Sequence, residues 1–357
     1  MGDHWGLDRL TELGGFPGGA AGSGAGTAWV LAEQRSERSL GPALAWARQA
    51  DAVRLHLLVE ADGGLLARRA LAFATAPQVW RVRGRMLEPA VAEPLAAVDA
   101  ATGGPGGELS DLGAIVERLT PTVRAMGADL VAHPDGSLRL EVLGLEVGRV
   151  GWPAVDDQTG PALRLEIGVG RHDREAHRMV QGDLDADGLG DLDGPVAAAL
   201  DEVVTQVNDH RRAGIPSHPA NQLAPERWLR TVLVARPDLV GAATLTPVEI
   251  PTLPSVLGEV GPAAALGTDS DGRPVLVVCS TGVDPDLVPA AVDACLSLSA
   301  GYGAPRASPA APGKPPRLVL AVPEQDDHPL TRALASALSE PAQVRAVDAA
   351  WRAATHE

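Results

Sequence analysis

Three glutamates in the middle of the chain have the residue type and spacing of a divalent-metal site. Glu141 and Glu146 lie in the apolar run 138–150, which predicts one long strand, and Glu166 lies in the next predicted strand, 163–169. A hairpin connection would bring the carboxylates of Glu146 and Glu166 together, and carboxylate oxygens are preferred ligands of Mg²⁺ and Ca²⁺. Alternatively, these carboxylates alternate onto a solvated sheet face and pair with arginines of the same strands. Those arginines are Arg139, Arg149 and Arg164.

A junction between a strand and a helix follows directly. Gly168 and Gly170 precede a helix predicted to begin near Asp173. Backbone N–H groups at such a junction can bind an anion, and nearby basic side chains can assist. The basic residues here are Arg171, His172 and Arg174. The alternative is an ordinary helix that Asp173 caps, with its charges in solvent.

The residues of this region are compatible with two functions. The first is a metal-dependent nuclease or hydrolase, with Glu146 and Glu166 as metal ligands and with His172 and Asp173 joining them as catalytic residues. The second is the binding of a small anion by Gly168, Gly170, Arg171 and Arg174.

An acidic loop further along has half of a calcium-binding pattern. Asp183, Asp185, Asp187 and Gly188 match the first half of a calcium loop, and Asp191 stands at its ninth position. The twelfth position, which should supply a bidentate glutamate, is a glycine. The loop is therefore expected to be an acidic surface loop, with calcium binding left open.

The charge balance argues against nucleic-acid ligands. The 357 residues include 46 acids and 30 bases, so the formal net charge is −16 and duplex nucleic acid is disfavoured as a partner. All the bases but one are arginines, and the single lysine, Lys314, lies in a Pro/Gly-rich stretch. A Walker-type phosphate loop and a Schiff-base lysine in a folded core are therefore excluded.

Cysteine content and hydropathy predict a reduced, cytoplasmic protein. Cys279 and Cys295 are too few for a disulfide framework, and both lie in apolar runs where a thiol stays protonated. The first residues, MGDHWGLDRL, lack the basic start and apolar run of a signal peptide. No segment approaches the ~18 apolar residues of a membrane span.

Short β-like runs alternate with helix-like runs along most of the chain. Residues 1–26, rich in glycine and alanine, are predicted to be a flexible lead-in. The rest divides into a first α/β unit (27–84), a linker (85–110), a middle region of hairpin and helices (111–212) and a C-terminal α/β unit (224–357). The predicted fold class is α/β, with mixed sheets flanked by helices and two related strand-helix-strand-helix-strand units.

The two α/β units share an internal repeat. Three pairs of segments align: 54–60 with 317–324, 69–72 with 332–335, and 77–82 with 341–347. Duplication explains the match, and chance similarity between Ala-rich helices and Val-rich strands is the alternative. Neither explanation bears on chemistry.

The order of elements in residues 224–347 is more specific. A helix with an early glutamate, Glu226, precedes a hairpin with a DxDG turn, and a helix, a strand, a helix and a strand follow. This order resembles the restriction-endonuclease-like nuclease fold. That resemblance implies an acid at the end of one hairpin strand, with an acid and a lysine two residues apart on the next, to hold Mg²⁺. The chain instead has Ala263–Ala265 and Val277–Thr281 there, and its nearest acids are Asp269 and Asp271 in the turn.

The leading hypothesis is therefore a non-catalytic, nuclease-fold-like cytoplasmic module that binds a partner, without a cofactor. The acidic balance favours a protein partner over duplex nucleic acid, and no membrane association is expected. The hydrolase and the anion-binding protein remain as alternatives, and the oligomeric state is open.

Overall fold

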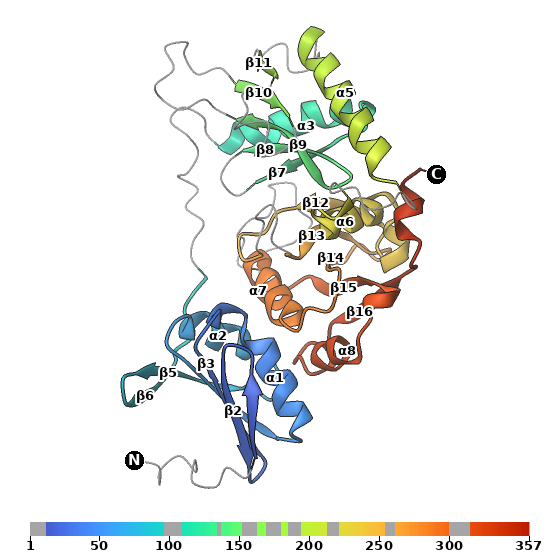
Figure 1. Ribbon diagram of the computed structural model, residues 1–357. Helices are drawn as coiled ribbons and strands as arrows, with labels where there is room; N and C mark the ends of the chain where they lie inside the picture. Colours follow the sequence, from blue (N-terminus) through green and yellow to red (C-terminus); the bar gives the residue numbers. More distant parts are fainter. Residues whose placement is uncertain are drawn as a thin grey trace. The chain divides into compact units, whose positions relative to one another are not determined.

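The computed structural model describes residues 12–95, 109–133, 137–151, 163–168, 180–184, 194–212, 221–253, 261–299 and 315–356. Helices flank three β-sheets in an α/β fold (Figure 1). The chain divides into two compact units. The first unit combines residues 1–96, 282–296 and 326–345, and the second unit holds the remainder.

The first sheet has six strands in the order β1-β2-β3-β4-β5-β6. The strands are β1 (Glu12–Phe16), β2 (Gly19–Gly24), β3 (Thr27–Ala32), β4 (Arg54–Val59), β5 (Gln78–Arg83) and β6 (Met86–Pro89). The central strands β3, β4 and β5 are parallel, so each connection must cross over the sheet. The short 3-10 helix η3 (Ser36–Arg38) with α1 (Leu40–Gln49), and then α2 (Gly63–Ala70), supply these crossovers.

The predicted flexible lead-in is wrong over residues 12–24, which form the β1–β2 hairpin at the edge of the first sheet. Backbone hydrogen bonds hold these two strands, so they need no bulky side chains. The glycines allow close packing instead: a Cβ at Gly14 would lie 3.2 Å from Nε1 of Trp46, and one at Gly19 would lie 1.9 Å from the Leu31 carbonyl oxygen. Glycine content here indicates tight contact rather than flexibility.

The predicted linker 85–110 also contains structure at both ends. Its first residues form β6, which pairs antiparallel with β5, and its last two begin α3 (Leu109–Ala125). Residues 96–108 lie outside the described part of the chain.

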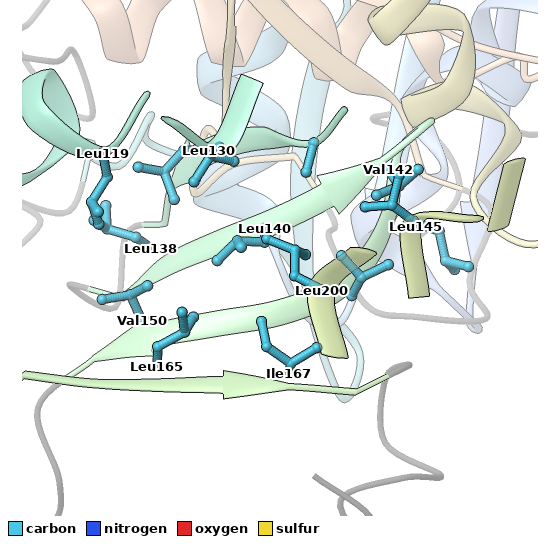
Figure 2. Close-up of a cluster of buried hydrophobic side chains, with 14 of the residues drawn as sticks. Leu119, Leu130, Leu138, Leu140, Val142, Leu145, Val150, Leu165, Ile167 and Leu200 are labelled. Atoms are coloured by element: carbon cyan, nitrogen blue, oxygen red, sulfur yellow. The ribbon is translucent and has the colours of Figure 1, made fainter. Parts of the chain in front are cut away.

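The middle sheet is antiparallel, in the order β11-β10-β9-β8-β7. Its strands are β7 (Asp129–Ala132), β8 (Leu138–Val142), β9 (Leu145–Gly151), β10 (Leu163–Ile167) and β11 (Val180–Leu184). Leucine, isoleucine and valine side chains on one face form a core with α3 and with α5 (Gly194–His210), shown in Figure 2. This face includes Leu138, Leu140, Leu165 and Ile167, each at most 2% exposed.

The single long strand predicted for residues 138–150 is two strands, β8 and β9, joined by a two-residue turn. Leu143 and Gly144 have φ angles of 48° and 77°. Positive φ at both central residues is the geometry of a type I′ hairpin turn, which usually requires glycine or asparagine. Leucine at the first position gave no sequence signal for this turn, because branched side chains rarely adopt positive φ.

The third sheet has the order β12-β13-β14-β15-β16. Its strands are β12 (Thr244–Val248), β13 (Ala263–Thr268), β14 (Pro274–Cys279), β15 (Arg317–Pro323) and β16 (Gln343–Val347). The helices in this part of the chain are α6 (Pro225–Ala235), η6 (Pro237–Val240), α7 (Leu287–Ser299), η7 (Glu324–Asp326), α8 (Pro329–Ser336) and η8 (Trp351–His356). One face of this sheet packs against α6, η6 and the start of η8.

The first and third sheets share a pairing pattern. β1, β2 and β3 pair antiparallel in succession and β4 then pairs parallel with β3; β12, β13, β14 and β15 repeat this sequence of pairings. Arg54 begins β4 and Arg317 begins β15, as the sequence alignment of the two segments has it.

Charged side chains are buried within the first unit. Arg69 of α2 contacts Asp286 and Asp293 at 3.3 and 3.4 Å, and Arg68 contacts Asp293 at 2.8 Å. The Gly41 amide of α1 donates a hydrogen bond to the Asp286 carboxylate at 3.0 Å. These contacts join α1 and α2 to the region of α7. No helix in the described ranges is long and apolar enough to span a membrane.

Candidate functional site

Two of the three candidate carboxylates face each other across the β8–β9 hairpin. Glu141 and Glu146 are paired residues of the ladder, and Glu166 on β10 is paired with Arg149 on β9. The ladder contains a β-bulge at Val147, between the pairs on either side of it. Because a bulge shifts the alternation by one residue, Glu146 and Arg149 lie on the same face of the sheet.

Two arginines contact the carboxylate of Glu146. Arg139 donates to one of its oxygens at 3.1 Å and Arg149 to the other at 3.4 Å, and Glu146 is only 5% exposed. A buried carboxylate between two guanidinium groups is neutralised, and a divalent ion would have to compete with both. Within the described ranges, no three His, Cys, Asp or Glu side chains are grouped so as to hold a metal ion.

Glu141 belongs to a second arginine network, with α6 and the end of β12. Arg227 and Arg230 of α6 each contact both Glu141 and Glu249. Two guanidinium groups thus face two carboxylates, and the net charge of this buried cluster is close to zero. Burial raises the pKa of Glu141, whereas Arg230 and Arg227 outweigh burial and lower the pKa of Glu249.

Gly144 explains why the hairpin reaches α6. A Cβ on Gly144 would lie 2.4 Å from the Arg227 carbonyl carbon and 2.5 Å from the Trp228 amide nitrogen. The turn therefore rests directly on the backbone of α6, a position that only glycine can occupy. Arg211, fully buried, donates to the Leu143 carbonyl at 2.5 Å and lies over the Trp228 ring at 5.0 Å. Glu141, only 1% exposed, is thereby held against α6, where Arg227 and Arg230 contact its two oxygens.

Most of the predicted anion-binding segment lies outside the described residues: Gly170, Arg171, His172, Asp173 and Arg174. Gly168 is described, and its amide donates to the Val147 carbonyl at 2.8 Å. That N–H is therefore committed to the sheet. Of the predicted calcium loop, Asp183 lies in β11, while Asp185, Asp187, Gly188 and Asp191 fall outside the description.

The DxDG turn and the neighbouring groups have structural partners. Asp269 accepts backbone hydrogen bonds from Asp271 at 3.1 Å and from Arg273 at 2.9 Å, as a turn-forming aspartate does. Glu226, 2% exposed, accepts a hydrogen bond from the Thr281 hydroxyl, and burial raises its pKa. Burial raises the pKa of the Cys279 thiol to about 12, so this thiol is unreactive near neutral pH.

A different surface emerges on the first sheet, on the face opposite α1 and α2. Side chains of Leu13, Trp29, Leu31, His56, Leu58 and Trp80 lie on it, as the strand registers show. We call these six residues the open face. Val30 and Leu57, on the helix-covered face, are fully buried, whereas Leu31 and Leu58 are half-buried and Leu13 is 82% exposed.

An aromatic stack forms the centre of the open face. The rings of Trp29 and His56 are parallel with their centroids 3.9 Å apart, and the Trp80 indole N–H donates to Nδ1 of His56 at 2.9 Å. An indole can only donate, so the neutral imidazole carries its proton on Nε2. Burial, with Arg54 nearby, lowers the pKa of His56. At neutral pH the stack is therefore uncharged and offers one N–H donor on an apolar surface.

The candidate residues selected from the sequence do not include His56 and did not identify this surface. A signal was present in the sequence: β3 reads TAWVLA and β4 reads RLHLLV, nearly continuous apolar runs. Such runs are typical of strands buried on both faces. Comparison with protein-family models, curated proteins and solved structures finds no match to this chain.

Proposed function

We propose that this protein is a non-catalytic binding protein and that its partner is a protein that docks on the open face of the first sheet. One observation carries the proposal: around the buried Trp29, five apolar and aromatic side chains of the same sheet face keep part of their surface exposed, while the core residues of the other face, such as Val30 and Leu57, are fully buried. Apolar surface of this kind, with tryptophan at its centre, is typical of protein interaction sites.

The same proposal includes a nuclease-like fold for residues 224–347 without its catalysis, and a duplication that relates it to the first α/β unit. The order of α6, three antiparallel strands, α7 and β15 supports the first point, and the shared pairing pattern supports the second. Val277, Val278 and Cys279, all fully buried, stand where the family has its acid and lysine. A cytoplasmic location and the absence of a cofactor are part of the same proposal.

A site-specific photocrosslinker tests the binding function. The crosslinking amino acid is placed at Leu58 on the open face and, as a matched control, at Leu71, which is 68% exposed after the end of α2. We expect one protein to be crosslinked from position 58, and its yield to fall when unlabelled wild-type protein competes. Equal labelling of the same proteins from both positions would refute the proposal.

An activity assay separates this function from the hydrolase. Duplex and single-stranded DNA and RNA are incubated with the full chain in Mg²⁺ and Mn²⁺, and no cleavage is expected. Cleavage that is lost in the Glu146→Gln variant would refute the non-catalytic proposal and favour the metal-dependent alternative at Glu146 and Glu166.

A further inference from the structure

The third sheet contains a counterpart of the open face, and there it is covered. A row of paired residues crosses the first sheet through Leu13, Gly22, Trp29 and His56. When β4 and β15 are aligned at their first residues, the matching row of the third sheet is Pro247, Ala265, Val277 and Val319. In the next row, Leu31 and Leu58 match Cys279 and Ala321.

Helix α6 covers this matching face of the third sheet. Trp228, Leu229, Val232 and Leu233 of α6 belong to one buried cluster with the sheet residues of that face. Those sheet residues include Ala265, Val277, Cys279, Val319 and Ala321, all fully buried. The pairing pattern common to both sheets, including its antiparallel strands, therefore accommodates a helix on this side.

We propose that the open face of the first sheet binds an amphipathic α-helix of a partner protein, in the place that α6 takes on the third sheet. The inference rests on the proposed binding function and goes further by naming the structure and chemistry of the partner segment. Within the described part of the first unit, α1 and α2 contact the other face of the sheet, and no helix is seen in the position of α6.

The sizes of the facing side chains define which residues the partner helix needs on its contact stripe, the row of side chains that would lie against the sheet. On the third sheet, one buried cluster combines large residues of α6 such as Trp228 with small sheet residues such as Ala265 and Ala321. The first sheet has Trp29, Leu31 and Leu58 in the matching rows, so the sheet side is already bulky. Dense packing requires large residues to face small ones, and the partner stripe should therefore be rich in alanine, serine and valine.

Polar groups at the open face add two requirements. Arg54, exposed at the start of β4, is the only charged side chain that β3, β4 and β5 direct to this side. A carboxylate on the partner helix would pair with it at the rim. The Nε2–H of His56 needs a hydrogen-bond acceptor once the surface is covered, since an unsatisfied buried donor is costly. The partner stripe should therefore include an acid or an amide next to its small residues.

The same features argue against a second copy of this chain as the occupant. Two identical open faces would oppose tryptophan and leucine with tryptophan and leucine, and would bring two Arg54 guanidinium groups to one interface. Each copy also carries a formal net charge of −16, so association of two copies adds electrostatic repulsion.

Two displayed peptide libraries test the inference on the immobilised full chain. The first presents amphipathic helices of about 20 residues, long enough for stable helix, with the stripe varied among Ala, Ser, Val, Leu, Phe and Trp. The second presents extended peptides that alternate apolar and polar residues. Clones are also tested against Leu58→Glu on the open face and against the control Leu71→Glu. Circular dichroism and urea unfolding verify that both variants fold, and His56→Gln provides a milder second variant.

Helical clones with small stripe residues and an acid or amide are expected, with affinity reduced at least about tenfold by Leu58→Glu and unchanged by Leu71→Glu. If only extended clones bind, and Leu58→Glu weakens their binding, the helical form of the partner segment is refuted while the proposed binding face still stands. Enrichment of Phe and Trp in the stripe would likewise overturn the inference on size. If neither library yields a face-dependent clone, the helix and the proposed binding function both fail. If sedimentation velocity detects a dimer that Leu58→Glu abolishes, the occupant of the open face is a second copy of this chain and the partner helix is refuted.

Discussion

The first and third sheets pair their strands in the same way and differ in what lies on one face. On the third sheet, small residues such as Ala265, Cys279 and Ala321 are fully buried beneath α6. On the first sheet, Leu31, His56, Leu58 and Trp80 take that side beside the buried Trp29, and these four remain only partly buried. The difference shows that two sheets with the same pairing pattern can bury the corresponding face to different degrees, because different elements of the chain pack on it.

The largest expected effect concerns the helix that covers the third sheet. Trp228 is fully buried, with the Trp351 ring edge-on at 5.5 Å. We expect Trp228→Ala to lower the free energy of unfolding by about 3–5 kcal/mol, because it removes a large buried side chain and leaves a cavity. Urea unfolding monitored by circular dichroism measures this effect. A loss below about 1 kcal/mol would mean that α6 is dispensable for the covered face.

The second prediction compares two arginines that the sequence repeat aligns. Arg69 is buried against Asp286 and Asp293, whereas Arg332 has an exposed side chain paired with Asp327 at 2.6 Å. Arg69→Ala should cost about 3 kcal/mol or more, since it leaves buried carboxylates without their cation. Arg332→Ala should cost only about 0.5 kcal/mol. Equal losses in urea unfolding would contradict the distinction between the two arginines.

The third prediction concerns pH and Asp286, beside the first sheet's helices. Burial, opposed by Arg69 and the Gly41 amide, raises the pKa of Asp286 from 3.8 to about 7. Between these values the folded protein holds a proton that the unfolded chain releases, so this group's contribution to stability falls as the pH rises towards 7. The loss is on the order of 2 kcal/mol between pH 5 and 8. Asp284 and Arg38 also face this carboxylate and modulate its pKa in opposite directions.

Urea unfolding at several pH values checks this dependence. Asp286→Asn should flatten the decline between pH 5 and 8, because the amide does not titrate. Asp51→Asn, at an exposed site, serves as the matched control and should retain the wild-type decline. An unchanged slope in Asp286→Asn would show that another group is responsible.

The smallest expected effect is on the open face itself. Leu58 is half-buried, so Leu58→Ser should lower the free energy of unfolding by about 1 kcal/mol or less, although its counterpart Ala321 is fully buried. A loss of several kcal/mol would show that the open face is already packed in the isolated protein, and the comparison between the two sheets would fail.

Apolar periodicity was sufficient to predict most helices and strands. The predicted order of elements in residues 224–347 is found as α6, the β13–β14 hairpin, α7, β15, α8 and β16, and the strand predicted for residues 163–169 is β10. The predictions failed where the side chains give no indication of the backbone conformation. The β1–β2 hairpin consists largely of glycine and alanine, and the turn at Leu143 uses an uncommon conformation for a branched residue.

The candidate site was less predictable, because contacts distant in sequence define it. Glu141 and Glu146 were expected on one strand, and the turn between them places them on two. Glu141 then pairs with Arg227 and Arg230, which are more than eighty residues away. No local pattern reveals such a pairing, since it depends on Gly144 resting on the α6 backbone.

The sequence by itself determined the α/β class, the acidic balance, the alignment of the two strand-helix units and the lack of an acid and a lysine on β14. Local propensity and composition establish these features, so they can be read residue by residue. Only the tertiary structure decided which carboxylates are neutralised by arginine and which sheet face remains open. Burial and ion pairing depend on which elements lie against one another in the folded chain, and local sequence patterns do not predict those contacts.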